Sequence, residues 1–140
     1  MSILASIKKA TPQAPVITIV GFAGSGKSSL AGMFPNPIFV QAENATSVFE
    51  TWAEDAQPAF LPQLPQPNAK RSVKTSEELF AQLRELMTEN HDFKTVVFDT
   101  ITALNLLFEQ EVVEFDDKNA SNIGEAAGGY NKGYLVVAGI

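Results

Sequence analysis

Cysteine is absent from the 140 residues of the chain, which excludes disulfide bonds and metal sites built on thiolates. Arginine is scarce as well: it occurs at Arg71 and Arg84, and the formal net charge is −6. Because basic side chains that neutralise phosphates supply most nucleic-acid affinity, this charge balance argues against a broad nucleic-acid-binding face in this sequence. The charge balance does not exclude nucleic-acid binding by a local basic loop or by a basic region in a longer chain.

Long hydrophobic runs are also missing. No apolar run approaches the roughly 18 residues that a membrane-spanning helix needs. The lysines near the N-terminus follow a short apolar patch, which reverses the order found in a secretory signal. We therefore expect a cytoplasmic protein without a membrane partner. What the sequence does contain, 45% hydrophobic and 19% charged residues, is ordinary for a single globular domain of this length.

The most informative segment is the glycine-rich stretch GFAGSGKSSLA at 21–31, which follows the apolar run VITIV at 16–20. It fits the pattern G-x-x-x-x-G-K-[ST] in full. In this pattern successive backbone N–H groups surround phosphate oxygens, and the following helix points its positive end at them. The expected nucleotide-binding residues are Gly21, Phe22, Ala23, Gly24, Ser25, Gly26, Lys27, Ser28 and Ser29.

Three of these residues have side-chain roles in the pattern. Lys27 is expected to reach the β- and γ-phosphates of ATP, and the Ser28 hydroxyl to hold Mg²⁺. Ser29 would add a contact to the α-phosphate. The alternative is a plain glycine turn followed by an exposed lysine. The strand expected before the motif and the helix expected after it favour nucleotide binding.

A second metal-site residue is expected at the end of a neighbouring strand. The apolar run TVVFD ends in Asp99, the position from which a carboxylate holds the Mg²⁺ shell in such sites. Asp99 would also suit the N-cap of the helix that follows, and the two roles need not exclude each other.

The residue that would activate the attacking water is less evident. Many P-loop ATPases place a glutamate directly after the metal aspartate, but Thr100 stands there in this chain. Glu43 is the best candidate for a catalytic residue, because it follows a predicted parallel strand at the edge where open α/β sheets bind ligands. Position alone does not separate this role from that of an ordinary loop glutamate.

Strands and helices alternate along the chain, which predicts an α/β fold with a mainly parallel sheet flanked by helices. Thr75 and Glu78 have the spacing of a capping box at the start of one helix. A proline-rich loop is expected at 57–68, with apolar residues that pack onto the body, and a short edge strand at 70–75. The other expected elements are strands at 16–20, 37–41 and 94–99, helices at 27–34, 76–90 and 101–115, and a short helix at 46–55.

Three segments together resemble the nucleotide-binding core of RecA-like ATPases: GSGKSSLA at 24–31, IFVQAEN at 38–44 and VVFDTITAL at 96–104. In that family a DAE segment after the second core strand carries the catalytic glutamate, and a VVDS-x-x-AL segment carries the metal aspartate. The resemblance implies these roles for Glu43 and Asp99. Gln41 departs from it, because the family tends to have an acid at that place.

The nearer resemblance is to the AAA-type nucleotide-binding proteins of phages, which are linked to recombination and single-strand annealing. It is carried by the proline after the first helix and by VKTSEEL, HDFKTVVFDTITAL and GGYNKGY. It implies Mg²⁺-dependent binding and hydrolysis of ATP in the service of DNA recombination, in the host cytoplasm. It also implies a homo-oligomer when full length, and contacts to single-stranded DNA through regions beyond this chain.

The C-terminal part departs from a complete RecA-like core, which carries a further central strand after the metal aspartate. The segment YLVVAGI at 134–140 reads as either a short strand or the first turns of a helix. We therefore expect an N-terminal lead-in at 1–14 and a P-loop NTPase domain at 15–140 that is truncated at its C-terminal end. Whether this chain turns over ATP stays open.

Two other functions stay open. The first is a module that binds ATP without hydrolysing it, or that serves for interaction. Every feature that such a module needs is present in the sequence. The second is a small-molecule P-loop kinase, which the shortage of arginine disfavours. An arginine finger for ATP hydrolysis would come from a neighbouring subunit or from a missing part.

Several further residues have ordinary interpretations. We expect His91 to be a solvated turn residue, and EQEVVEFDD at 109–117 to be a solvated helix face and end. Three aromatic residues, Phe49, Trp52 and Phe60, are expected to pack in the core and loops. Tyr130 and Tyr134 could face DNA in a longer protein.

Overall fold

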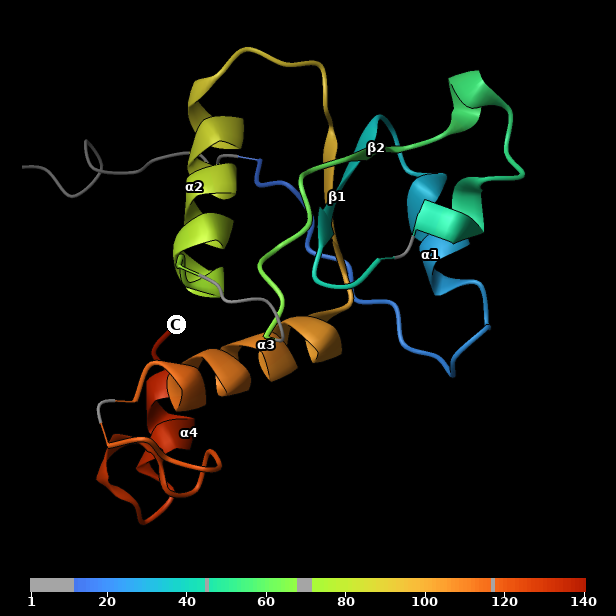
Figure 1. Ribbon diagram of the computed structural model, residues 1–140. Coiled ribbons are helices and arrows are strands. Elements are labelled where there is room, and N and C mark those ends of the chain that lie inside the picture. The colour runs from blue at the N-terminus through green and yellow to red at the C-terminus, as the bar shows by residue number, and fades with distance from the viewer. Residues whose placement is uncertain (1–11, 45, 68–71, 117) are drawn as a thin grey trace, which may run out of the picture.

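The computed structural model describes residues 12–44, 46–67, 72–116 and 118–140 (Figure 1). Its centre is a sheet of three parallel strands in the order β2-β1-β3. The strands are β1 (Pro37–Gln41), β2 (Ala59–Phe60) and β3 (Thr95–Asp99). Because the strands are parallel, their carboxyl ends meet at one edge of the sheet. The expected α/β architecture is therefore confirmed.

Helices cover both faces of this sheet. Side chains of β1 alternate between the faces: Phe39 packs with Ala31 and Phe49 on one, and Val40 packs with a second cluster on the other. The α-helices are α1 (Lys27–Gly32), α2 (Thr75–Thr88), α3 (Ile101–Glu114) and α4 (Lys132–Val137), and the 3₁₀ turns are η2 (Thr46–Phe49), η3 (Glu54–Ala56) and η4 (Ala126–Gly128).

Most expected elements are present with small shifts of their ends. The strands expected at 37–41 and 94–99 are β1 and β3, and the helices expected at 76–90 and 101–115 are α2 and α3. The helix expected at 27–34 ends at Gly32, two residues early. The short helix expected at 46–55 is two separate 3₁₀ turns, and the C-terminal segment is helical. Among the described helices, none combines the length and hydropathy needed to cross a membrane.

Aromatic rings fill the space between α1, η2 and the sheet. The rings of Phe39 and Phe49 lie 5.3 Å apart, and those of Phe49 and Trp52 lie 5.0 Å apart, both edge to face. Phe60 completes the group at 5.3 Å from Phe39. Such ring pairs add to the free energy of burial. The expectation that Phe49, Trp52 and Phe60 are packing residues is confirmed.

The proline-rich loop after β2 lies on the body of the domain as expected. Leu64 is almost completely buried in the cluster formed with α2 and α3. The loop is also tied to β1, because the backbone N–H of Leu61 donates to the carbonyl of Phe39 and the side-chain amide of Gln41 donates to that of Leu61. Gln41, the residue that departs from the family pattern, thus fastens this loop.

The strand expected at 16–20 is not formed. The segment is extended, but no pairing joins it to the sheet, and Val16 and Val20 are 95% and 90% exposed. Ile19 alone among these five residues packs against the aromatic cluster. β-Branched residues favour an extended backbone, but a strand also needs a neighbour to pair with. In the described part of the chain, β3 is the last strand of the sheet on this side, and the segment 16–20 does not pair with it.

The start of α2 also differs from the expectation. The N-cap is Lys74, and Thr75 is the first helical residue, so the predicted capping box is wrong. The buried Thr75 hydroxyl donates instead to the carbonyl of Pro65 in the proline-rich loop. Residues 72–74 are not a strand, and 70–71 lie outside the described residues.

A buried carboxylate joins α2 to α3. Glu111 is 4% exposed, and its two oxygens accept hydrogen bonds from the Ser76 hydroxyl at 2.6 Å and the Ser76 backbone N–H at 2.8 Å. The expectation that this part of α3 is a solvated face is therefore wrong at Glu111. The carboxylate satisfies a backbone N–H in the first turn of α2, which has no partner within the helix.

Replacing Glu111 with alanine is expected to lower the free energy of unfolding by about 2–3 kcal/mol, because Ser76 loses both acceptors in a buried position. Urea denaturation followed by circular dichroism measures this change. Glu85→Ala on the exposed face of α2 is the matched control and should stay within about 0.5 kcal/mol of the parent. Equal effects of the two substitutions would contradict this account of the α2–α3 contact.

Candidate functional site

The glycine-rich loop has a backbone that side chains would disturb. Gly24 and Gly26 have φ angles of +74° and +85°, a region that favours glycine. At Gly21 the obstacle is space, because a Cβ there would lie 2.6 Å from the Ser25 hydroxyl oxygen. These three glycines therefore maintain the shape of the loop that runs into α1.

Lys27, the first residue of α1, folds back over this loop. Its ammonium donates to the carbonyl oxygen of Phe22 at 2.8 Å. The side chain of Phe22 is 92% exposed. The Lys27 charge is thus held at the glycine-rich loop, where an anion would meet it.

Ser28 and Asp99 meet although 71 positions separate them in the sequence. The Ser28 hydroxyl donates to a carboxylate oxygen of Asp99 at 2.6 Å. Asp99 is the last residue of β3 and is 8% exposed. Both groups offer oxygen atoms, the ligand type that Mg²⁺ prefers. The two residues selected from the sequence as metal ligands therefore lie together and fit such an ion.

The alternative role of Asp99 as a helix cap is wrong. The N-cap of α3 is Thr100, whose hydroxyl oxygen accepts a hydrogen bond from the backbone N–H of Ala103 at 3.1 Å. This leaves the Asp99 carboxylate directed toward α1 and Ser28.

Glu43 lies at the same edge of the sheet. It follows β1 by two residues and is exposed to solvent. The Thr100 hydroxyl donates to its carboxylate at 3.5 Å, a long hydrogen bond. β1 and β3 are neighbours in register, with Gln41 opposite Asp99, so Glu43 is brought close to Thr100, the residue that follows Asp99.

Thr100 is the site residue that the sequence reasoning missed. It entered that reasoning only as the residue that replaces a glutamate. Its position directly before the helix 101–115 was the available signal, since threonine is a favoured N-cap residue. In the structure it contacts Glu43 with the same hydroxyl that caps α3.

Other candidates lie away from this group. His91 is exposed and contacts the carbonyl of Leu86, and the described residues contain no group of three or more histidine, cysteine, aspartate or glutamate side chains that could hold a metal ion. Arg84 is on α2, and Arg71 lies outside the described residues. Tyr130 and Tyr134 are 95% and 49% exposed near the C-terminal end.

Comparison with known proteins gives the family. Residues 13–138 match the model of a family described as AAA domain. The chain belongs to the AAA domain family. The match covers the glycine-rich loop, Glu43 and Asp99, and membership supports nucleotide binding of the P-loop NTPase type. No curated protein and no solved structure matches the chain.

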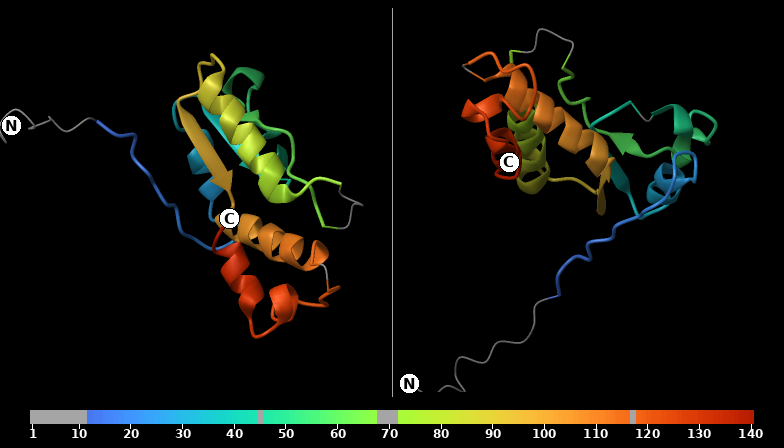
Figure 2. Two further views of the ribbon diagram at one scale, coloured as in Figure 1. Left: turned by 90° about the vertical axis from the view of Figure 1, so that its left-hand side faces the viewer. Right: turned by 90° about the horizontal axis from the view of Figure 1, so that it is seen from below.

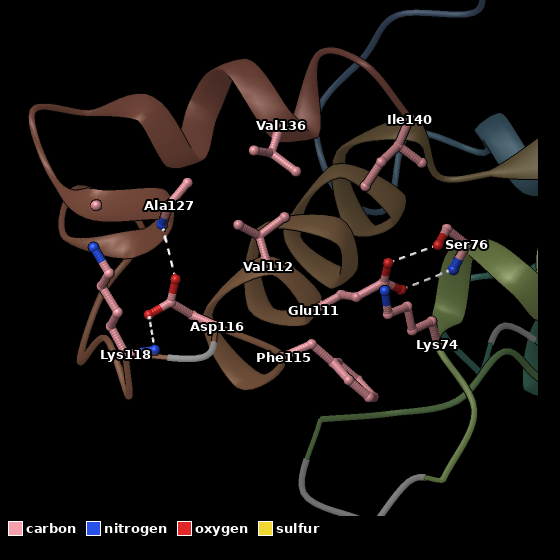
Figure 3. A pocket seen from close by; sticks show the side chains of 11 residues that line it. Lys74, Ser76, Glu111, Val112, Phe115, Asp116, Lys118, Ala127, Val136 and Ile140 are labelled. Atoms are coloured by element: carbon pink, nitrogen blue, oxygen red, sulfur yellow. Dashed lines mark hydrogen bonds between the residues drawn. The ribbon is translucent and has the colours of Figure 1, made fainter.

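A separate cavity of about 450 Å³ lies between α2, α3 and α4, away from the glycine-rich loop of this AAA domain (Figure 3). Its middle is apolar, with Val112, Val136 and Ile140. At one end the Asp116 carboxylate accepts hydrogen bonds from the backbone N–H groups of Ala127, Ala120 and Lys118. The hydrogen bond from Ala127 is the main cause that lowers the pKa of Asp116 below its ordinary value, followed by those from Ala120 and Lys118.

This lowered pKa predicts acid sensitivity of the segment that follows α3. A carboxylate with a lowered pKa in the folded state stabilises it above the unfolded pKa, and this stabilisation is lost as the pH falls through the folded value. We expect the Ala127 amide resonance to be constant at neutral pH and to shift below pH 3.8, the ordinary pKa of the group. Asp116→Asn should abolish this titration, whereas Asp55→Asn at an exposed site should preserve it. A titration that persists in Asp116→Asn would contradict the assignment.

Proposed function

We propose that the protein binds ATP together with Mg²⁺ and hydrolyses it. The observation that carries this proposal is the hydrogen bond of 2.6 Å between Ser28, at the start of α1, and Asp99, at the end of β3. A serine after the phosphate-loop lysine and an aspartate on a neighbouring strand are the pair that holds Mg²⁺ in P-loop NTPases. Membership of the AAA domain family supports the same assignment.

Each residue of the loop has a part in this proposal. The backbone N–H groups of residues 21–29 bind the phosphates, and Lys27 adds a positive charge at the β- and γ-phosphates. Ser29 contacts the α-phosphate. Bound Mg²⁺ would neutralise charge on the phosphate oxygens. Ser28 and Asp99 would hold the ion by direct contact or through its water shell.

Glu43 is the proposed catalytic residue that orients and polarises the attacking water. In support of this role, the hydroxyl of Thr100, the residue after Asp99, donates a long hydrogen bond to the Glu43 carboxylate, which stays exposed to solvent. ATP hydrolysis needs positioning and electrostatic stabilisation rather than a covalent intermediate, so a carboxylate at this place suffices.

ATP binding by the purified chain, measured by calorimetry with Mg²⁺ and with a chelator, tests the core of the proposal. We expect Mg²⁺ to strengthen binding by at least about tenfold in the parent, and this gain to disappear in Asp99→Asn because the negative charge of the carboxylate is replaced by a neutral amide. Asp92→Asn, at an exposed site before β3, is the matched control and should keep the gain. A parent chain that binds no ATP would refute the proposal.

The biological role that we propose is DNA recombination or single-strand annealing in a phage. It rests on the resemblance of the segments around 73–79, 91–104 and 128–134 to phage AAA-type proteins. In this role the full-length protein is a homo-oligomer that contacts single-stranded DNA through regions beyond this chain. Stimulation of ATP turnover by single-stranded but not double-stranded DNA in the full-length protein would support it.

A second candidate is a module that binds ATP without hydrolysing it. The unpaired segment 16–20 favours this alternative, because the phosphate loop then lacks a paired strand on its N-terminal side. Binding without turnover by the parent chain would select it. A phosphoryl-transferring kinase is disfavoured, since Arg84 is the one arginine among the described residues and lies on α2.

A further inference from the structure

The hydroxyl of Thr100 lies between the start of α3 and Glu43. Its oxygen accepts a hydrogen bond from the backbone N–H of Ala103 at 3.1 Å, which caps α3. Its proton is donated to the Oε1 atom of Glu43 at 3.5 Å. A threonine hydroxyl has one proton and two lone pairs, so it can accept from a helix N–H and donate to a carboxylate at the same time.

The fold fixes Thr100 on both sides. Thr100 directly follows β3, and its carbonyl oxygen accepts a hydrogen bond from the backbone N–H of Leu104 at 3.0 Å. Leu104 is buried in the same core cluster as Val40 of β1. Both views in Figure 2 show α3, in orange, beginning at the carboxyl end of β3. Because the side chain of threonine is also stiff about its first rotatable bond, the direction of this hydroxyl is set by the strand and the helix.

The side chain of Glu43 has few constraints of its own. Glu43 lies beyond the end of β1 and is exposed, and among the described residues Thr100 alone forms a hydrogen bond with its carboxylate. The amide of Gln41, the last residue of β1, donates instead to the carbonyl of Leu61. An exposed glutamate side chain has several rotamers of similar energy, and ordering it costs conformational entropy. A donor of fixed direction restricts this freedom.

We propose that Thr100 is a positioning residue that orients the Glu43 carboxylate for ATP hydrolysis. Its hydroxyl binds Oε1, which leaves Oε2 to accept a hydrogen bond from the attacking water. The inference rests on the proposed catalytic role of Glu43. It adds the residue through which that carboxylate is aligned and the oxygen atom that faces the water.

The place of Thr100 in the chain favours this role. Asp99 directly precedes it and accepts the hydrogen bond of Ser28 at 2.6 Å. The proposed metal-site carboxylate and the donor to Glu43 are thus neighbours at the end of one strand. A general base acts only within hydrogen-bond reach of the water whose proton it takes, so its position relative to the metal-bound phosphate matters. Attachment to Thr100 refers that position to β3 instead of to the loop after β1.

The length of the hydrogen bond leads to a further expectation. A strong hydrogen bond between a hydroxyl and a carboxylate is about 2.5–2.7 Å long, shorter than the 3.5 Å between Thr100 and Glu43. Catalytic hydrogen bonds often shorten when the substrate binds. We expect the contact between Thr100 and Glu43 to shorten in the complex with Mg²⁺-ATP.

Single-turnover ATP hydrolysis by variants of Thr100 tests the role. Thr100→Val is similar in size but lacks the hydroxyl, and it should lower the rate at saturating ATP by at least about tenfold because the base is misaligned. ATP affinity, measured by calorimetry, should stay within about twofold of the parent. Thr100→Ser keeps the hydroxyl and should restore the rate to within about threefold. Thr88→Val removes an exposed hydroxyl on α2 and is the matched control, with the rate of the parent expected.

A double-mutant cycle with Glu43→Ala separates positioning from the loss of the α3 cap. If Thr100 acts through Glu43, adding Thr100→Val to Glu43→Ala should change the remaining rate by less than about twofold. An equal loss of rate in the parent and in Glu43→Ala would overturn the inference, as would a Thr100→Val variant as fast as a parent that hydrolyses ATP. A parent that binds ATP without turnover would refute the proposed hydrolysis itself, and this inference with it.

Discussion

Replacing Lys27 with alanine is expected to weaken ATP binding by about 100-fold or more and to abolish turnover. The ammonium lies at the glycine-rich loop, 2.8 Å from the carbonyl of Phe22. In the proposed complex it would contact two phosphates, and each charge-assisted hydrogen bond contributes about 1.5–3 kcal/mol. Lys27→Arg should not restore binding, because the planar guanidinium is larger than the ammonium and has a different donor geometry.

Calorimetry with Mg²⁺-ATP and a phosphate-release assay measure the two effects of Lys27→Ala. Lys94→Ala is the matched control, since Lys94 is exposed in the turn before β3 and its side chain takes no part in the proposed site. The control should bind and turn over ATP like the parent. Unchanged ATP affinity in Lys27→Ala would remove the glycine-rich loop from the proposed function.

Replacing Glu43 with glutamine is expected to lower ATP turnover by about 10²–10⁴-fold, the usual contribution of a general base. ATP affinity should stay near that of the parent, because the proposed phosphate and metal contacts come from other residues. Glutamine keeps the size of the side chain and an oxygen that accepts the Thr100 hydrogen bond. The substitution therefore tests the charge of the carboxylate and leaves the local structure in place.

Single-turnover kinetics with saturating ATP separates binding from hydrolysis in Glu43→Gln. The matched control is Glu50→Gln, an exposed glutamate in the loop after η2. A parent chain that hydrolyses ATP, together with a Glu43→Gln variant that hydrolyses it equally fast, would assign the water-activating role to another group. A simultaneous loss of binding and turnover would point to a structural role for Glu43 instead.

Local signals in the sequence were sufficient for much of the fold. β1 and β3 are short apolar runs bounded by prolines or polar residues, and α3 follows an apolar pattern of helical length. Such patterns depend on residues close together in the chain, so they can be read without knowing what packs on them. The glycines at 24 and 26 belong to the same class, because their positive φ angles are a local requirement of the loop.

The candidate site was predictable for a different reason. Its residues come from three separate segments, and their identities could be proposed from a loop pattern and from the rule that ligands meet the carboxyl ends of parallel strands. The contact between Ser28 and Asp99 followed only once β3 was placed next to α1. The hydrogen bond from Thr100 to Glu43 depends on the register of β1 against β3, which no local pattern encodes.

The sequence by itself determined the glycine-rich loop, the positions of β1, β3, α2 and α3, and the family to which these belong. Tertiary structure decided whether each segment found a partner. The run at 16–20 has a strand sequence but no neighbour to pair with, Thr75 gives its hydroxyl to Pro65, and Glu111 is buried against Ser76. The physical reason is common to these cases: propensity acts within a few residues, whereas pairing, burial and hydrogen-bond satisfaction depend on segments that lie far apart in the chain.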